Sequence, residues 1–372
     1  MQTTHRVRFE NAAEMTGIAS RSIDLVVTSP PYPMIRMWDD VFNRLNPAVS
    51  GLLTAERARE AFDAMHDELD PVWREVHRVL KPGGLACINI GDAVRKIGNQ
   101  FRLYPNHSRI LNRLQEIGFS CLPQILWRKQ TNAPNKFMGS GMLPPNAYVT
   151  LEHEHILILK KAGQRSFAGP AAGQNRRESA YFWEERNIWF SDVWMDIKGT
   201  GQNMKSRRGR DRSAAFPFEV PYRLINMFST KGDTVLDPFL GTGTTMHAAM
   251  AAARNSLGYE MAPEFRPTVR TSFTGMVERT HQRIQNRLEA HATFVDRRQA
   301  DGYAFKHINR YYGFAVMTAQ ETDLYLDPPT TMEETETDEF RVTYTAAAPG
   351  TTDPCEYRVR RRDRPQQVKL FS

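Results

Sequence analysis

The segment Ser29-Pro30-Pro31-Tyr32 places a hydroxyl, two rigid prolines and a phenol directly after an apolar run. The prolines fix φ and carry no N–H, so the Pro30 carbonyl and the Ser29 hydroxyl stay free to accept hydrogen bonds. An exocyclic amine of a nucleobase suits these acceptors, because hydrogen bonds from the amine favour a pyramidal nitrogen with a directed lone pair. Tyr32 would then stack on the base. Taken alone, the segment is more typical of a proline-rich turn.

A second candidate segment, Asp237-Pro238-Phe239-Leu240-Gly241-Thr242-Gly243-Thr244, joins a strand to a helix. Its two glycines allow the backbone to approach a ligand closely, next to a helix N-terminus. The segment has neither the Gly-Lys-Ser/Thr of a phosphate-binding loop nor the third glycine of a dinucleotide fingerprint. Glu260 ends the following strand and is placed to accept both hydroxyls of a ribose. The pattern favours a nucleoside cofactor without a pyrophosphate over a simple tight turn.

Alternating strands and helices must position these two segments. The alternation predicts an α/β fold built from parallel strands with right-handed crossovers. Residues 128–212 interrupt it with Asn, Pro, Gly, Arg and aromatic residues, as an insertion would. We expect strands at 5–10, 23–28, 85–90, 122–127, 154–159, 234–237 and 256–260, and helices at 55–80, 108–117, 220–229, 244–253 and 267–290. The acidic run 333–339 reads as a solvated turn or sheet edge.

Composition excludes several classes of protein. The chain has 372 residues, enough for a core without disulfides, and its three widely spaced cysteines indicate a reducing compartment, the cytoplasm. From the polar N-terminus we expect no signal peptide, and without a run of 18 apolar residues we expect no membrane span. Residues 261–372 hold 16 basic and 16 acidic residues, so the whole net charge of +7 belongs to residues 1–260. Residues 198–212 alone carry +5.

Five segments in order resemble the S-adenosylmethionine-dependent DNA amino-methyltransferases, and their order resembles the β class of that family. The segments are Thr-Ser-Pro-Pro-Tyr at 28–32, Val-Leu-Lys-Pro-Gly-Gly at 79–84, Ile-Leu-Trp-Arg-Lys at 125–129, Ala-Phe-Pro at 215–217 and Asp-Pro-Phe-Leu-Gly-Thr-Gly-Thr-Thr at 237–245. The resemblance implies a seven-stranded, mostly parallel Rossmann-like methyltransferase sheet in permuted order. It also implies four parts: the catalytic half of the core (1–130), an inserted target-recognition region with a core strand near 151–160 (131–212), the cofactor-binding half (213–262) and a C-terminal extension of unknown role (263–372).

The resemblance implies roles for individual residues. Ser29, rather than Asp or Asn, before Pro-Pro-Tyr is closer to the cytosine-N4 enzymes than to the adenine-N6 enzymes. A histidine often seen near Phe216 is absent, and Asn11 stands where relatives frequently have Asp. The implied catalytic residues are Ser29, Pro30, Pro31 and Tyr32, and the implied cofactor-binding residues are Asn11, Phe216, Asp237, Pro238, Phe239, Gly241, Gly243, Thr244 and Glu260.

The basic segment lies between the two motif blocks, where the family would carry target recognition. Lysine and arginine neutralise phosphates, and arginine also reads guanine in the major groove. The candidate DNA-binding residues are Lys205, Arg207, Arg208, Arg210 and Arg212. His153 and His155 share one face of a strand, but the sequence shows no third ligand nearby, so we expect no metal. Pro354-Cys355 lies in the tail and is not taken as the nucleophile of a cytosine-C5 enzyme.

The sequence therefore predicts a site-specific DNA methyltransferase that flips a cytosine out of the duplex and methylates N4. Adenine N6 is the nearest alternative; an RNA or small-molecule methyltransferase, or a catalytically dead nucleic-acid-binding protein, follows at a distance. The expected partners are double-stranded DNA and, within the same system, a restriction endonuclease that is not a stable subunit. We expect a monomer or homodimer in the cytoplasm, associated with the nucleoid.

Overall fold

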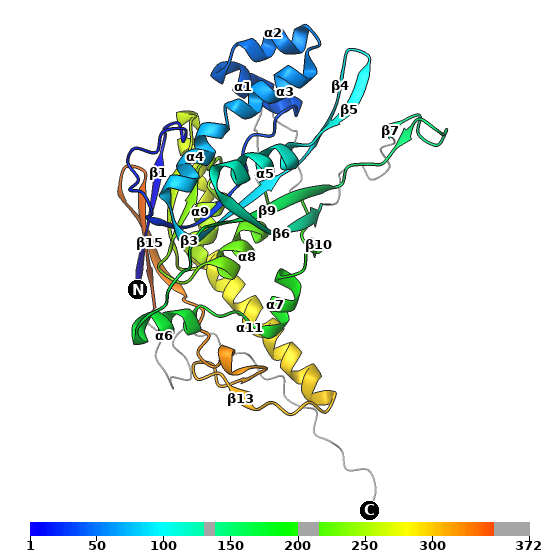
Figure 1. The fold of residues 1–372 in the computed structure, drawn as a ribbon. Helices are drawn as coiled ribbons and strands as arrows, with labels where there is room; N and C mark the ends of the chain where they lie inside the picture. Colours follow the sequence, from blue (N-terminus) through cyan, green and yellow to red (C-terminus); the bar gives the residue numbers. More distant parts are fainter. Residues whose placement is uncertain (130–137, 200–215, 346–372) are drawn as a thin grey trace, which may run out of the picture.

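The computed structural model describes residues 1–129, 138–199 and 216–345 of the chain, and one large sheet forms its centre (Figure 1). The strand order is β10-β6-β9-β3-β2-β11-β12-β1-β16-β15. The strands are β1 (Gln2–Arg8), β2 (Ile23–Thr28), β3 (Leu80–Ile90), β6 (Phe119–Arg128), β9 (His153–Lys161), β10 (Val193–Trp194), β11 (Thr234–Asp237), β12 (Asn255–Tyr259), β15 (Pro329–Glu336) and β16 (Glu339–Tyr344).

The middle of the sheet is parallel, as expected: β3, β2, β11, β12 and β1 pair with one another in the same direction. Next to β3, strands β9 and β6 run antiparallel. Together these seven strands form the inner part of the sheet. The described sheet has ten strands, because β10 adds to one edge and the hairpin β15–β16 adds to the other through β1. The C-terminal extension therefore continues the central sheet, and most of the acidic run lies on its edge strand β15.

Helices cover both faces of the sheet (Figure 1). They are α1 (Asp39–Leu45), α2 (Ala48–Thr54), α3 (Ala58–Asp67), α4 (Asp70–Val79), α5 (Asn106–Ile117), α6 (Pro170–Glu178), α7 (Trp183–Trp189), α8 (Glu219–Phe228), α9 (Thr244–Ala251), α10 (Arg266–Ser272) and α11 (Met276–Ala300). Small hairpins are formed by β4 (Ala93–Ile97) with β5 (Gln100–Tyr104), by β7 (Met138–Gly139) with β8 (Ala147–Tyr148), and by β13 (His307–Ile308) with β14 (Ala315–Val316).

Strand β2 shows why the apolar run at 23–28 becomes a central strand. All six of its residues are buried. Successive side chains point to opposite faces, so Val26 joins the core under α4 and α5, while Leu25 and Val27 join the core under α8 and α9. A strand covered on both faces has no solvent side. Its carboxyl end is thereby fixed at the middle of the sheet edge.

Two expected helices differ from the structure. The helix expected over 55–80 is two helices, α3 and α4, because Pro71 occupies the first turn of α4 and starts a new helix there. The helix expected over 267–290 is also two helices, with Gly275 at φ +68° before α11, which continues to Ala300. At the C-terminus of α5, Gly118 adopts the expected left-handed conformation with φ +114°.

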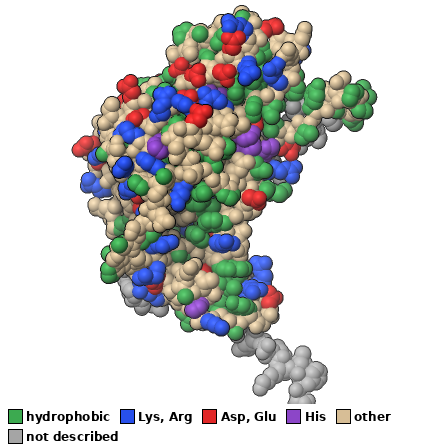
Figure 2. Space-filling model, in the orientation of Figure 1, with side chains coloured by type: hydrophobic (Ala, Val, Ile, Leu, Met, Phe, Trp, Pro, Cys, Tyr) green, Lys and Arg blue, Asp and Glu red, His purple; other side chains and the backbone are tan. Residues whose placement is uncertain are grey.

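The chain also has an arm beyond the sheet, around β7 and β8 (Figure 1). Hydrophobic side chains gather on this arm (Figure 2), where Met142, Leu143 and Val149 are strongly exposed. No helix in the described ranges is both long and apolar enough to cross a membrane. The basic residues predicted for DNA binding, 205–212, lie outside the described residues.

Candidate active site

The two candidate segments, far apart in the sequence, meet at the carboxyl ends of neighbouring strands. Strands β2 and β11 pair directly, with Leu25 opposite Val235 and Val26 opposite Leu236. Just beyond these pairs, the Thr28 hydroxyl donates a hydrogen bond of 2.5 Å to Oδ1 of Asp237. Thr28 precedes Ser29, and Asp237 opens the glycine turn. The fold therefore places the Ser-Pro-Pro-Tyr segment against the glycine turn.

The Tyr32 hydroxyl lies at the centre of a buried polar network. It donates to Oε2 of Glu154 at 2.9 Å, accepts from the Asn89 amide at 2.8 Å and lies 3.0 Å from the Ser29 hydroxyl. Asn89 also donates to Glu154 at 2.7 Å, and the Lys129 ammonium pairs with the other oxygen of Glu154. Ser29 is half-buried, while Tyr32, Asn89 and Glu154 are buried. The network thus leads from Ser29 to a lysine near the surface.

Close packing holds Tyr32 in this position. A Cβ atom on Gly91 would come within 2.9 Å of the Tyr32 ring and 3.3 Å of Cγ of Glu154, so only glycine allows this approach. Burial, followed by the nearby Glu154 carboxylate, raises the pKa of the Tyr32 hydroxyl well above its usual range. Tyr32 is therefore a neutral phenol that donates its single proton to Glu154.

The glycine turn is fixed by the carboxylate that ends β12. Oε2 of Glu260 accepts a hydrogen bond of 2.9 Å from the Gly241 amide, and Oε1 accepts one of the same length from the Ala262 amide. Gly241 and Gly243 have φ +54° and +86°, a region that favours glycine. A Cβ atom on Gly241 would meet only a backbone oxygen at 4.0 Å, which leaves open space above the turn.

Two carboxylates give this end of the sheet a negative character. Burial raises the pKa of Asp237 to about 6, although hydrogen bonds from Thr245, Thr28 and the Phe239 amide oppose the shift. Burial also raises the pKa of Glu260, with a further contribution from Asp237. Among the described residues, the groups that shift these two pKa values most are hydrogen-bond donors and other carboxylates, and none is a lysine or an arginine. Such a site suits a cationic ligand that carries hydroxyls, and it disfavours a phosphate. The sulfonium, ammonium and ribose of S-adenosylmethionine meet these requirements.

The other predicted cofactor residues differ in burial and in what they contact. Phe239 is half-buried with its ring edge-on to Trp73 at 5.7 Å, and Pro238 is buried. Thr244 begins α9. Phe216 is 7% exposed and packs in the core beneath α8 and α9, and Asn11 is exposed, with its side chain accepting from the Ala13 amide.

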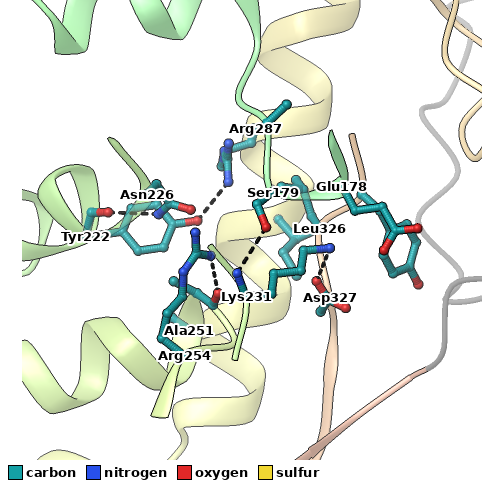
Figure 3. A pocket seen from close by; sticks show the side chains of 14 residues that line it. Glu178, Ser179, Tyr222, Asn226, Lys231, Ala251, Arg254, Arg287, Leu326 and Asp327 are labelled. Atoms are coloured by element: carbon teal, nitrogen blue, oxygen red, sulfur yellow. Dashed lines mark hydrogen bonds and ion pairs between the residues drawn. The ribbon is translucent and has the colours of Figure 1, made fainter. Parts of the chain in front are cut away.

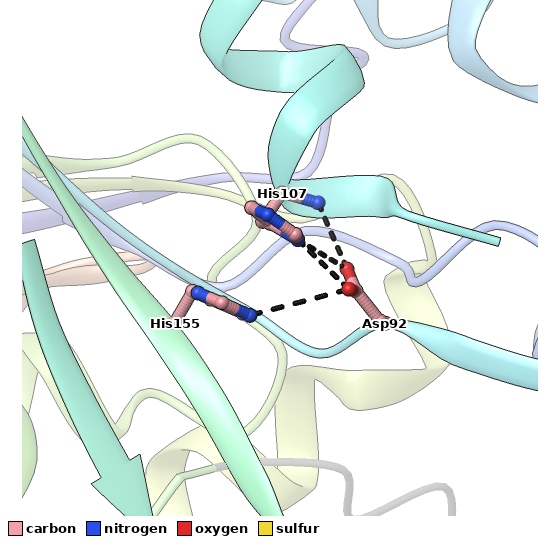
Figure 4. A group of neighbouring side chains, drawn as sticks. All are labelled: Asp92, His107 and His155. Atoms are coloured by element: carbon pink, nitrogen blue, oxygen red, sulfur yellow. Dashed lines mark hydrogen bonds and ion pairs between the residues drawn. The ribbon is translucent and has the colours of Figure 1, made fainter. Parts of the chain in front are cut away.

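A group of possible metal ligands lies beside the Tyr32 network. Figure 4 shows Asp92, which follows β3, facing both His107 of α5 and His155 of β9. The sequence offered no third ligand for His153 and His155, whereas the fold brings Asp92 and His107 to His155 from distant segments. Both oxygens of Asp92 lie 2.8 Å from Nδ1 of His107, and Oδ1 also accepts from the His107 amide.

The two imidazoles of this group stack with centroids 3.8 Å apart. Burial, followed by the proximity of His107, lowers the pKa of His155 to about 4, so His155 is neutral. Asp92 secures the start of α5 through its hydrogen bonds with His107. The absence of a metal stays a prediction.

Sequence reasoning missed Asn89 and Lys129, and it treated Glu154 only as the neighbour of two histidines. Asn89 and Glu154 are polar residues within apolar strands, which is the one signal that the sequence offered. Both residues form hydrogen bonds with Tyr32, which lies far from them in the sequence. A local sequence pattern cannot predict such a long-range contact.

Comparisons with known proteins agree with this geometry. Residues 23–270 match the family described as DNA methylase, which groups N6 and N4 enzymes. The chain is 49% identical over 350 residues to the type II methyltransferase M.MthZI of Methanothermobacter thermautotrophicus, covering 94% of this chain and 97% of that protein. It is 50% identical over 278 residues to M.MjaI of Methanocaldococcus jannaschii, covering 72% and 90%.

A solved structure supports the same assignment. A DNA modification methylase from Thermus thermophilus, crystallised with S-adenosyl-L-methionine, is 32% identical and superposes with a TM-score of 0.57. The superposition covers 73% of this chain and 94% of that one.

Proposed function

The chain belongs to the DNA methylase family of N6 and N4 enzymes, and from that premise we propose that it methylates N4 of a flipped cytosine at a specific site in duplex DNA. S-adenosylmethionine is the methyl donor. The observation that carries the proposal is the hydrogen bond between Thr28 and Asp237, which joins the acceptor segment to the glycine turn. Donor and acceptor of the methyl group would therefore bind side by side.

When bound, S-adenosylmethionine supplies an electrophilic methyl group. Asp237 and Glu260 would hold its cationic and ribose parts. The glycine turn, open at Gly241, would lie beneath it, and Gly243, Phe239, Pro238, Thr244, Phe216 and Asn11 would lie around it. The Ser29 hydroxyl and the Pro30 carbonyl would accept the two amine hydrogens and direct the nitrogen lone pair. Positioning of this kind supplies most of the rate, because it holds the reacting atoms in near-attack geometry.

Cytosine is proposed rather than adenine because Ser29 stands before Pro-Pro-Tyr, as in cytosine-N4 enzymes. Adenine N6 remains the second candidate, since the same acceptors suit both amines. The type II names of M.MthZI and M.MjaI support a site-specific enzyme with a restriction endonuclease in the same system.

Mass spectrometry of nucleosides from DNA methylated in vitro tests the proposal. N4-methylcytosine is expected, and N6-methyladenine without it would overturn the choice of base. Labelled methyl that enters RNA but not duplex DNA would overturn the substrate class, and failure to bind S-adenosylmethionine in calorimetry would indicate a nucleic-acid-binding protein without catalysis.

A further inference from the structure

Glu154 is a buried carboxylate whose described contact with the catalytic segment is its hydrogen bond with Tyr32. Its side chain is 7% exposed, and it lies near the start of β9, opposite Trp127 of β6. Oε2 accepts from both the Tyr32 hydroxyl and the Asn89 amide, and Oε1 pairs with Lys129. Each of these three contacts brings a donor to a carboxylate oxygen of Glu154. Glu154 is thus a pure acceptor within the network.

The number of hydrogens on each group fixes the direction of every hydrogen bond. Tyr32 has one hydroxyl hydrogen, and it donates this hydrogen in its hydrogen bond to Glu154. The Tyr32 oxygen then acts as an acceptor, and it already receives the Asn89 amide at 2.8 Å. Between Ser29 and Tyr32, at 3.0 Å, only Ser29 has a hydrogen left to donate. Ser29 therefore points its hydrogen inward and keeps its lone pairs for another partner.

We propose that Glu154 is a positioning residue that acts through Tyr32 to make Ser29 a hydrogen-bond acceptor for the substrate amine. The inference rests on the proposed function, because it assumes that an amine occupies the place in front of Ser29. A hydroxyl alone has no fixed polarity, since it donates or accepts as its neighbours dictate. The chain from Lys129 through Glu154 and Tyr32 sets that polarity before the substrate arrives. The same logic holds for cytosine N4 and adenine N6.

The first variant is Glu154→Gln in the full-length protein, assayed for methyl transfer from labelled S-adenosylmethionine to duplex DNA. An amide keeps the shape but replaces one acceptor oxygen with a donor nitrogen, so the polarity of Tyr32 and Ser29 is no longer imposed. We expect kcat to fall by about 10- to 100-fold. The KM for DNA and the Kd for S-adenosylmethionine in calorimetry should change by less than about twofold, because Glu154 acts on the site through Tyr32 and no hydrogen bond described for it reaches the glycine turn.

A double-mutant cycle separates this role from a merely structural one. If Glu154 acts through Tyr32, then Tyr32→Phe lowers kcat by a similar factor, and adding Glu154→Gln to it costs little more. Multiplicative losses in the double variant would overturn the inference. Lys129→Met provides a second route if Glu154→Gln does not fold, because the Lys129 side chain is 42% exposed. It should lower kcat, and Lys129→Arg should restore it.

Glu152→Gln is the matched control. Glu152 lies two residues before Glu154 and pairs with Arg128, as Glu154 pairs with Lys129, but no hydrogen bond described for it reaches Tyr32. Its kcat should equal that of the wild type. If the wild type is active and Glu154→Gln has the same kcat, the inference about Glu154 is wrong but the proposed function stands. If the wild type transfers no methyl group to DNA, both the proposed function and this inference are wrong.

Discussion

Ser29 is the residue on which the proposed chemistry depends most directly, and its removal should separate binding from turnover. In Ser29→Ala the amine loses one acceptor, so we expect kcat to fall about 100-fold while the Kd for S-adenosylmethionine stays unchanged. Single-turnover methylation and calorimetry measure the two quantities. Ser50→Ala, at an exposed position on α2, is the control. If Ser29→Ala keeps its methylation rate but no longer binds S-adenosylmethionine, the roles assigned to the Ser-Pro-Pro-Tyr segment and the glycine turn are reversed.

Asp237 predicts a pH dependence of cofactor binding. Its pKa of about 6 in the free protein lies above the ordinary value, so the carboxylate is ionised at pH 7.5 and largely protonated at pH 5. A cationic ligand prefers the ionised form. The Kd for S-adenosylmethionine should therefore rise as pH falls through 6, approaching about tenfold for each pH unit.

Calorimetry between pH 5 and 8 measures this slope. Asp237→Asn should weaken binding at pH 7.5 and flatten most of the dependence; a slope equal to that of the wild type would assign the titration to another group.

The sequence predicted Ser29 to Tyr32 and Asp237 to Glu260 because each set lies in one local segment with its own turn chemistry. It did not predict Glu154 as part of the site, because the significance of that residue comes from contacts with residues 32 and 89 on other strands. Alternation along β9 separates Glu154 from His153 and His155. The Glu154 carboxylate contacts the Tyr32 network, whereas His155 stacks on His107.

At the level of elements, the core strands were predictable because their apolar runs are bounded by glycine and proline. The expected helix over 267–290 stopped short of the end of α11, although the sequence contains the signal for it. Buried residues recur at 276, 280, 284, 288, 291 and 295, a helical spacing that continues past residue 290. The turn or sheet edge expected at 333–339 falls on the edge strand β15 and the turn after it, but the neighbours of the outer strands could not be predicted. Strand β16 pairs with β1, its partner from the opposite end of the chain, and only the folded sheet reveals that neighbour.

The C-terminal extension is held to the core by a buried ion pair. Nζ of Lys231 lies 2.5 Å from Oδ2 of Asp327, and the two side chains are 6% and 9% exposed. Figure 3 shows the pair in a pocket lined by α6, α8, α11 and the segment before β15, with Arg254 and Arg287 nearby. Burial lowers the pKa of Lys231, and Asp327 opposes that shift. Asp327 therefore offsets the cost of burying a cation.

Asp327→Asn should destabilise the protein by about 3 to 5 kcal/mol, because it leaves the Lys231 ammonium buried without its counterion. A lower urea midpoint at unchanged slope measures the loss. The double variant Lys231→Met with Asp327→Leu is the comparison, since an apolar pair of similar volume should recover most of the stability. If the single and double variants unfold at the same midpoint, the loss comes from packing rather than from the unpaired charge.

For the whole molecule, the distribution of charge predicts how DNA binding responds to salt. The net charge of +7 is modest, but residues 198–212 carry +5 in the segment between the two halves of the site. Phosphate contacts release counterions, so each contact adds about 0.9 to the slope of log K against log salt. Replacing Arg207, Arg208 and Arg210 with serine should therefore weaken DNA binding and reduce that slope by up to about 3.

A control must remove the same charge elsewhere, because lower net charge alone weakens association with DNA. The control variant replaces three basic residues near the end of α11 with serine, namely Arg297, Arg298 and Lys306. It loses the same three positive charges, but away from the strand ends that hold Ser29 and Asp237. Fluorescence anisotropy with duplex DNA between 50 and 300 mM salt compares the two triple variants. A reduced slope in the 207–210 variant alone places those arginines on phosphates. Equal reductions in both variants would assign the effect to the net charge of the molecule. An unchanged slope in the 207–210 variant would show that these arginines do not contact phosphates.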